Sequence, residues 1–186
     1  MAAGRDVKKW TVDLKDKWLI VTKIGMDMKQ YPAIMAHLKQ WEPQLKARSD
    51  QGNHWWELRS CAYYDALDKP KIIVPAFMVQ AGYALDSQGV YVCDPAGFIA
   101  SQDLYLLGVL NSAALWLYFE NSTTSVQNGY LRIYLRELTN LPIPNAPDSE
   151  RAAIAALVQK CLDARGVDCA AWEADINARV AALYGL

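Results

Sequence analysis

Long hydrophobic runs and a surplus of charge of either sign are missing from this sequence of 186 residues. No apolar run approaches the roughly 18 residues that cross a bilayer, and the opening MAAGRDVKKW has no apolar signal core. With 19 Lys and Arg against 20 Asp and Glu, the net charge is −1 and does not by itself favour a polyanionic partner. We therefore expect a cytoplasmic protein that is not in a membrane.

Cysteine and histidine are scarce, and catalytic motifs are absent. The four cysteines are Cys61, Cys93, Cys161 and Cys169. They form no CxxC or zinc-type pattern, so we expect reduced thiols. The sequence has no nucleophile elbow, zinc-protease helix, phosphate-binding loop or dinucleotide fingerprint. We predict no catalytic residue, no metal and no cofactor in this chain; a stand-alone enzyme stays open only if His54, Asp65 and Asp68 converge.

Length and composition suit one globular domain, with 53% hydrophobic and 21% charged residues. Two β-branched runs, at 18–24 and 72–75, predict strands that are buried on both faces. Between them Pro32 begins a helix, which Pro43 interrupts late. The apolar stripe of this helix is Ile34, Leu38, Trp41 and Leu45. Turn signals separate three further short strands, which are predicted at 83–85, 89–93 and 97–100.

The second half of the chain is dominated by helices. An apolar helix from about Ser101 to Phe119, with Asp103 in its first turn, is predicted to be central and buried. Its Asn111 needs a hydrogen-bond partner if it is buried. A strand at 131–134 follows, and then amphipathic helices at about 148–165 and 172–183.

These elements predict a mixed α/β fold of the α+β class, in which a central buried helix packs on a short-stranded sheet beside a C-terminal helix pair. The expected limits are 1–17 for an N-terminal lead-in or linker, 18–146 for a recognition core, and 147–186 for the helix pair on the same domain.

Aromatic, amide and basic side chains interleave in two stretches, 48–59 and 127–136. Such mixtures suit DNA, because Arg, Asn and Gln read base edges while Lys and Arg neutralise phosphates. The first 82 residues carry 13 basic against 9 acidic side chains, whereas residues 83–146 carry 2 against 5. The candidate DNA-binding residues are Arg48, Asn53, His54, Arg59, Lys69, Lys71, Gln127, Asn128, Tyr130, Arg132 and Arg136.

Six ordered blocks, spread over residues 18–186, carry a family resemblance. They are Tyr31-Pro32-Ala33-Ile34 with the helix after it, Trp55-Trp56-Glu57-Leu58-Arg59, Lys69-Pro70-Lys71-Ile72, the run from Tyr105 to Ser112, Leu141-Pro142-Ile143-Pro144, and the run from Ile176 to Leu186. Together they resemble the C-terminal specificity domain of TaqI-like adenine-specific DNA methyltransferases, a family that includes bifunctional type II restriction–modification enzymes.

The resemblance implies a target recognition domain that clamps double-stranded DNA against a separate methyltransferase domain. The base readers would lie before the Leu-Pro-Ile-Pro block, at Gln127, Asn128, Tyr130, Arg132 and Arg136. Arg48, Asn53, His54, Lys69 and Lys71 would be backbone or second-groove contacts. S-adenosylmethionine is implied only for the methyltransferase domain, because its cofactor loop and Asn/Asp-Pro-Pro-Tyr/Phe motif are not in this chain. We therefore expect a non-catalytic recognition fragment of a larger enzyme.

A second hypothesis is a protein-interaction module, in which the C-terminal helix pair docks a partner subunit of a restriction–modification complex. It predicts an exposed apolar patch within residues 150–184. The DNA hypothesis instead predicts a positive groove that is lined by Arg48, Lys69, Lys71, Arg132 and Arg136.

Overall fold

The computed structural model describes residues 1–186, which form two units by their internal contacts. Unit 1 contains Met1–Lys17 and Ala66–Leu186, and unit 2 contains Trp18–Asp65. These limits differ from the domain limits expected from the sequence. Helices and small antiparallel sheets together confirm the α+β class.

The sheet of unit 1 is built around strand β3 (Lys71–Pro75), all of whose residues are buried. It lies between β5 (Ala84–Asp86) and β6 (Ala96–Ile99) and is antiparallel to both. The β-branched run of β3 fits a position covered on both faces, and Pro75 ends the strand because proline donates no ladder hydrogen bond. The strand predicted at 72–75 is therefore confirmed, whereas 89–93 contributes only an isolated bridge between Ala2 and Val92.

Two helices form where one was predicted between Ser101 and Phe119. Helix α4 (Leu104–Leu110) is capped by Asp103, whose carboxylate accepts from the N–H groups of Tyr105 and Leu106. Helix α5 (Ala113–Ser122) starts anew, because the Ser112 hydroxyl accepts from Leu115 N–H and caps it. Asn111 between the two helices is buried and bonds the backbone of Tyr83 in both directions, at 2.9 and 3.0 Å. The need for a partner at Asn111 is thus confirmed.

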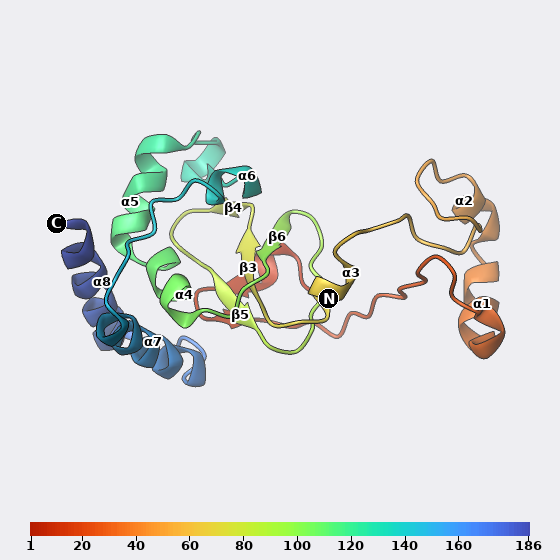
Figure 1. Ribbon diagram of the computed structural model, residues 1–186. Helices are drawn as coiled ribbons and strands as arrows, with labels where there is room; N and C mark the ends of the chain where they lie inside the picture. The colour runs from red at the N-terminus through yellow and green to blue at the C-terminus, as the bar shows by residue number, and fades with distance from the viewer. The chain divides into compact units, whose positions relative to one another are not determined.

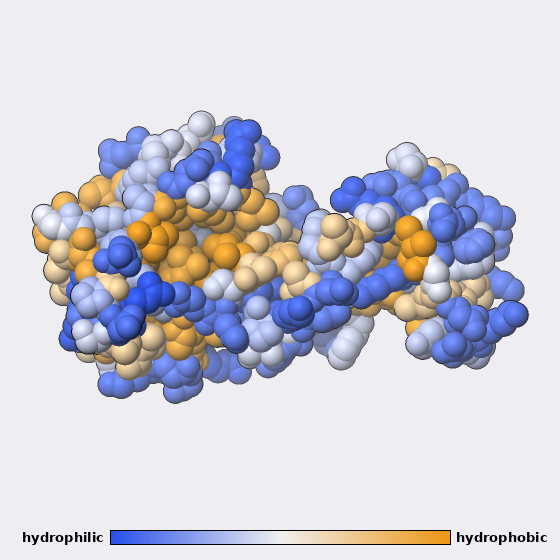
Figure 2. Space-filling view, in the orientation of Figure 1, coloured by the Kyte–Doolittle hydropathy of each residue, from blue (hydrophilic) through white to orange (hydrophobic).

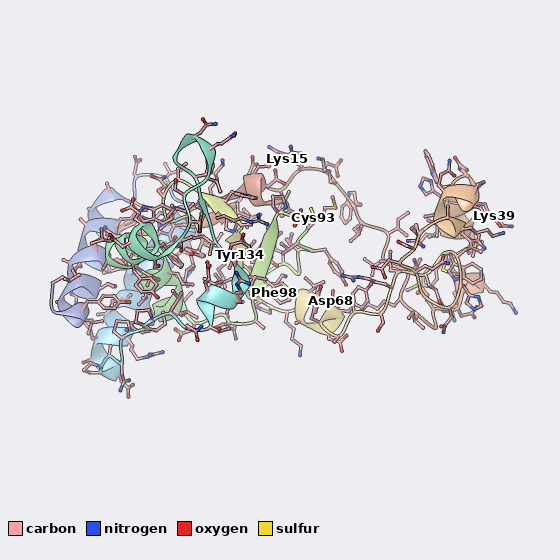
Figure 3. The ribbon with its side chains drawn as sticks, turned by 90° about the horizontal axis from the view of Figure 1, so that it is seen from above. Lys15, Lys39, Asp68, Cys93, Phe98 and Tyr134 are labelled. Carbon is pink, nitrogen blue, oxygen red and sulfur yellow. The ribbon has the colours of Figure 1, made fainter.

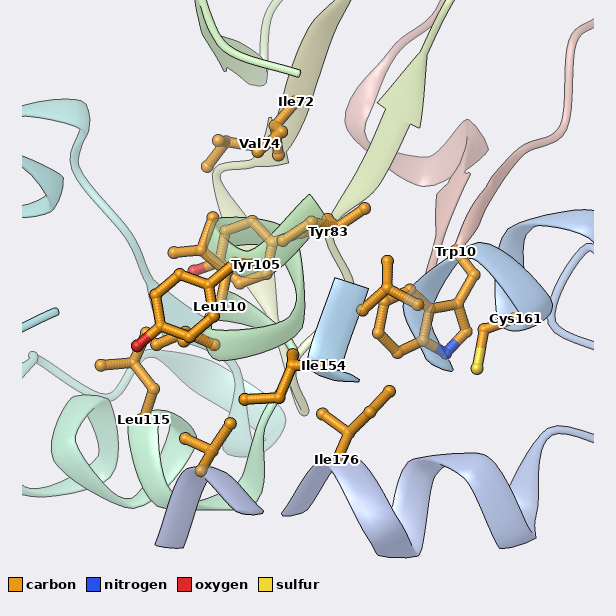
Figure 4. Close-up of a cluster of buried hydrophobic side chains, with 14 of the residues drawn as sticks. Trp10, Ile72, Val74, Tyr83, Tyr105, Leu110, Leu115, Ile154, Cys161 and Ile176 are labelled. Atoms are coloured by element: carbon orange, nitrogen blue, oxygen red, sulfur yellow. The ribbon is translucent and has the colours of Figure 1, made fainter. Parts of the chain in front are cut away.

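The C-terminal helices α7 (Asp148–Asp163) and α8 (Ala170–Tyr184) pack on each other and on α4. Helices α4, α5, α7 and α8 lie together on one side of the strands of unit 1 (Figure 1). Gly108 lets α4 approach α7 closely, since a Cβ there would lie 2.7 Å from Ile154 Cγ2. Figure 4 shows the resulting core, in which Ile154 and Ile176 lie among side chains from α4 and the strands.

The first 17 residues are part of this core, although the sequence suggested a linker. They include the 3-10 turn η1 (Gly4–Asp6) and a hairpin of β1 (Val7–Lys8) and β2 (Thr11–Val12). Trp10 is only 2% exposed and lies beside Cys161 (Figure 4). Its indole N–H donates to Glu173 of α8. Burying an indole contributes strongly to a core, so this segment is structural.

Unit 2 contains no strand, so the buried strand predicted at 18–24 is wrong. Trp18 is 90% exposed, and only Thr22 of that run is buried. The predicted helix divides into α1 (Pro32–Lys39), which follows the turn η2 (Met28–Gln30), and α2 (Glu42–Lys46). No residue of the expected apolar stripe is fully buried. A short helix α3 (Tyr64–Leu67) spans the boundary between the two units.

The loop of unit 2 is organised by a buried carboxylate. Glu57 is 1% exposed and accepts from the N–H groups of Gly25 at 3.0 Å and His54 at 2.9 Å. The Gly25 bond is the largest influence that keeps the pKa of Glu57 below its usual value. Nearby, the Arg48 guanidinium donates to the carbonyls of Leu45, Trp55 and Glu57.

Candidate nucleic-acid interface

The segment after α5 forms an exposed loop with an ordered base. β7 (Leu131–Arg132) pairs with β4 (Phe77–Met78), so Arg132 lies opposite Phe77. The Val126 N–H donates to the Tyr130 carbonyl at 2.7 Å and closes the turn η3 (Gln127–Gly129). Asn128 and Gly129 both have positive φ, at 60° and 75°, which asparagine and glycine tolerate best. Gln127, Asn128 and Tyr130 are all exposed at this tip.

Two arginines of this segment lie on aromatic rings. The Arg132 guanidinium is 4.7 Å from the centre of the Tyr134 ring and 5.6 Å from that of Phe77. Arg136, in the short helix α6 (Leu135–Leu138), is 4.9 Å from the same Tyr134 ring. Figure 3 shows Tyr134 beside the strands of unit 1. Ring faces hold a cation in place without using its N–H donors, so both guanidinium groups keep donors for a ligand.

Carboxylates near these arginines are otherwise engaged. Glu137 accepts from the Tyr134 N–H at 3.1 Å and so caps its own helix. Neither Arg132 nor Arg136 forms an ion pair, and both are exposed. The central third of the sequence is acidic in sum, but its two arginines lie four residues apart, on β7 and α6, without an ion-pair partner.

A groove of about 390 Å³ lies next to this loop. One side is the N-terminal segment around η1 and β1, and the other is residues 77–82 with Tyr130. Arg5 and Lys8 line the groove, and both are exposed. Figure 2 shows hydrophobic residues gathered over the middle of unit 1, with hydrophilic residues around them. Sequence reasoning missed Arg5 and Lys8, although the signal was present as the basic cluster Arg5-x-x-Lys8-Lys9.

Two residues connect the groove and the loop: Tyr130 belongs to both, and Phe77 lines the groove and contacts Arg132 of the loop. We call the combined region the arginine–aromatic surface. Its members are Arg5, Lys8, Phe77, Tyr130, Arg132, Tyr134 and Arg136. Exposed aromatic rings among unpaired cations are typical of nucleic-acid-binding surfaces, where rings contact bases or sugars and cations contact phosphates.

Lys71 does not belong to this surface, which corrects the expectation that it contacts DNA. Its side chain is 0% exposed, and it forms an ion pair with Asp86, which lies opposite it in the β3–β5 register. The ammonium group also donates to the Leu67 carbonyl at 2.7 Å. A lysine buried in this way cannot reach a phosphate. Lys69, two residues earlier, is exposed.

The candidate DNA-binding residues of unit 2 differ in how accessible their side-chain donors are to a ligand. Arg48 is half-buried, and its Nε and Nη2 groups donate to backbone carbonyls of its own loop, so fewer of its donors are available to a ligand. Asn53 and His54 are exposed, and the His54 ring stacks on Trp56 at 4.4 Å with an 11° interplanar angle. Arg59 is exposed and pairs with Asp50 at 3.2 Å. Of these, Asn53 and His54 have the most accessible side-chain donors.

A family model described as the TaqI-like C-terminal specificity domain matches residues 1–143. The chain belongs to this family. The match spans the N-terminal segment, unit 2 and the whole arginine–aromatic surface, and it ends before α7. It therefore includes residues 1–17, which the sequence resemblance left out. No curated protein matches the chain.

A TaqI-like specificity domain is a DNA-recognition module of a methyltransferase and is non-catalytic in itself. DNA and a methyltransferase domain are the partners that the family implies. None of the helices is both long enough and apolar enough to cross a bilayer. The side chains also form no cluster of three or more His, Cys, Asp or Glu residues around a common point.

Proposed function

We propose that this chain is the target recognition module of an adenine-specific DNA methyltransferase from a restriction–modification system, and that the loop 127–136 reads the DNA sequence. The observation that carries the proposal is the placement of the exposed Arg132 and Arg136 on the half-buried Tyr134 ring, without any ion pair. Guanidinium groups that are held in position but keep free donors suit bidentate contacts to guanine. Gln127 and Asn128 at the neighbouring tip carry amides that suit adenine.

The remaining parts of the reaction belong to another domain. Binding of S-adenosylmethionine and extrusion of the target adenine require a cofactor loop and a base-gripping motif that this sequence does not contain. Asp94-Pro95-Ala96-Gly97 is no match for that motif. In this proposal Lys69, Asn53, His54 and Arg59 contribute backbone contacts, and the methyltransferase domain closes the other side of the DNA.

The alternative, a subunit-docking module with little affinity for DNA, gains less support. It predicts an exposed apolar patch within 150–184, where Val167 is the one large hydrophobic side chain that is strongly exposed. The outer faces of α7 and α8 instead carry charged pairs such as Arg179 with Glu150.

A binding experiment on pools of random duplexes tests the proposal. The chain is titrated with the pool at several salt concentrations, and the retained sequences are read before and after Arg132→Ala. If Arg132 reads a base, the variant loses preference at one position and about 1–3 kcal/mol of discrimination there. Lys160→Ala, on the exposed side of α7, is the matched control and should leave the preference unchanged. A pool that shows no preference with the unaltered chain would overturn the proposal.

A further inference from the structure

The groove lies beside the loop 127–136, which we call the reading loop. The proposed function gives no role to the basic wall of this groove. That wall is formed by the turn η1 and strand β1, and Arg5 and Lys8 line it. The opposite wall contains the exposed side chains of Phe77 and Val79, at 40% and 52% exposure, together with Tyr130. An open groove of about 390 Å³ with one cationic wall and one apolar wall fits an elongated, amphipathic anion better than a compact ion.

The local fold directs these two cations outward. Val7 is buried and Lys8 exposed, because side chains alternate between the faces of a strand. Asp6 is turned inward, and its carboxylate accepts from the Ala3 N–H at 3.0 Å. The acid between the two basic residues is therefore used within the turn and does not neutralise them.

The neighbouring Lys9 behaves differently and serves as an internal comparison. Its ammonium pairs with Glu173 at 2.8 Å and lies 5.5 Å from the centre of the Trp10 ring. The Lys9 side chain therefore links the N-terminal segment to α8. Arg5 and Lys8 have no such partner, so two of the three basic residues in this cluster are free for a ligand.

We infer that the groove binds the sugar–phosphate backbone of one strand of duplex DNA, with Arg5 and Lys8 as its phosphate contacts. The inference rests on the proposed function and adds a site to it. Tyr130 belongs both to the groove and to the tip of the reading loop, so a strand that is read at Arg132 continues past Tyr130 into the groove. The N-terminal segment would then fix the register of the DNA, while the loop 127–136 supplies specificity.

The salt dependence of binding measures the number of phosphates that are neutralised. For B-DNA, each contact contributes about −0.9 to the slope of log K against log salt. Arg5→Gln and Lys8→Gln should therefore each make the slope shallower by about 0.9, and the double variant by about 1.8. Over a fourfold rise in salt, the double variant should lose about 12-fold less affinity than the unaltered chain. Sequence preference in the random pool should not change.

Lys160→Gln is the matched control, since it removes one exposed positive charge on α7, outside the groove. Both groove positions are exposed, so the variants should fold, and unchanged thermal midpoints would verify this. Either single variant is sufficient for the test.

The possible outcomes separate the inference from the proposed function. If the chain selects sequences but Arg5→Gln and Lys8→Gln leave the slope equal to that of Lys160→Gln, the groove does not hold the backbone and the proposed function stands. If those variants alter the selected sequence, Arg5 or Lys8 reads bases and the phosphate assignment is wrong. If the chain binds no duplex at low salt, even at protein concentrations on the order of 10⁻⁴ M, both ideas fail.

Discussion

The buried ion pair of Lys71 and Asp86 gives the most direct test of how unit 1 is stabilised. We consider Lys71→Met, which keeps a long unbranched side chain in β3 but removes the ammonium group. Both members of the pair are almost fully buried, with side chains 0% and 2% exposed. After the change, the Asp86 carboxylate would keep only the N–H groups of Gln88, at 2.9 Å, and Val90, at 2.8 Å.

Removing one partner of a buried pair typically costs about 3–5 kcal/mol, because the remaining charge stays buried without compensation. A domain of this size loses roughly 2–4 °C of thermal midpoint per kcal/mol, so we expect a fall of about 6–20 °C. The measurements are urea unfolding for the free energy and thermal unfolding for the midpoint, both followed by circular dichroism. The exposed neighbour Lys69→Met is the control and should change stability by less than about 0.5 kcal/mol.

A second substitution tests whether the uncompensated charge of Asp86 causes the loss of stability. Adding Asp86→Asn to Lys71→Met removes the uncompensated negative charge and keeps an oxygen that can accept from the Val90 N–H. The double variant should therefore recover about 1–3 kcal/mol relative to Lys71→Met alone. The reasoning is refuted if Lys71→Met costs less than about 1 kcal/mol, or if it makes the salt slope of DNA binding shallower by about 0.9, as a phosphate contact would.

Three further predictions concern other buried polar groups. Asn111→Leu should destabilise unit 1 by about 1–3 kcal/mol in urea unfolding, because it leaves the buried N–H of Tyr83 without a partner, while the Tyr83 C=O keeps only the Trp10 N–H; a neutral effect would contradict this. Because the folded pKa of Glu57 is lowered from 4.5, chiefly by the Gly25 N–H, its stabilisation is complete above that value and is lost as pH falls through the lower folded pKa. Amide NMR of unit 2 should follow this loss, and Glu57→Gln should flatten it. Burial raises the pKa of the Cys161 thiol to about 12, so mass-mapped alkylation at pH 8 should label Cys61 long before Cys161 in the folded chain; equal rates would argue against it.

Local sequence patterns predicted the elements whose determinants are also local. The run at 72–75 became the centre of a sheet, and the caps at Asp103 and Ser112 follow from side chains next to the helix starts. The same reasoning failed at 18–24, where a β-branched run found no partner strand. A strand requires a ladder as well as a pattern, and the ladder depends on distant residues.

The candidate site shows the same division. The loop 127–136 was proposed as a DNA reader from its own residues, because arginines and aromatics alternate within ten positions, and that role stays a prediction. Lys71 was misplaced since its partner Asp86 lies 15 residues away, and nothing within Lys69-Pro70-Lys71 signals burial. Arg5 and Lys8 were missed because only the folded chain brings the N-terminal segment next to Phe77 and Tyr130.

The small net charge of the chain fits a module that selects DNA without holding it tightly. Four unpaired cations, Arg5, Lys8, Arg132 and Arg136, lie on the arginine–aromatic surface. If all four neutralised phosphates, this surface would contribute only about −3.6 to the salt slope, and each cation that reads a base instead makes that contribution smaller. Non-specific affinity would then stay near the weak end of the usual range, about 10⁻⁴ M at physiological salt. In the proposed function, discrimination depends instead on how rigidly Arg132 is held, and its contacts with the Tyr134 and Phe77 rings favour that rigidity without using its donors. If the proposed function holds, the methyltransferase domain supplies most of the affinity, and the isolated chain should rank sequences correctly while binding all of them weakly.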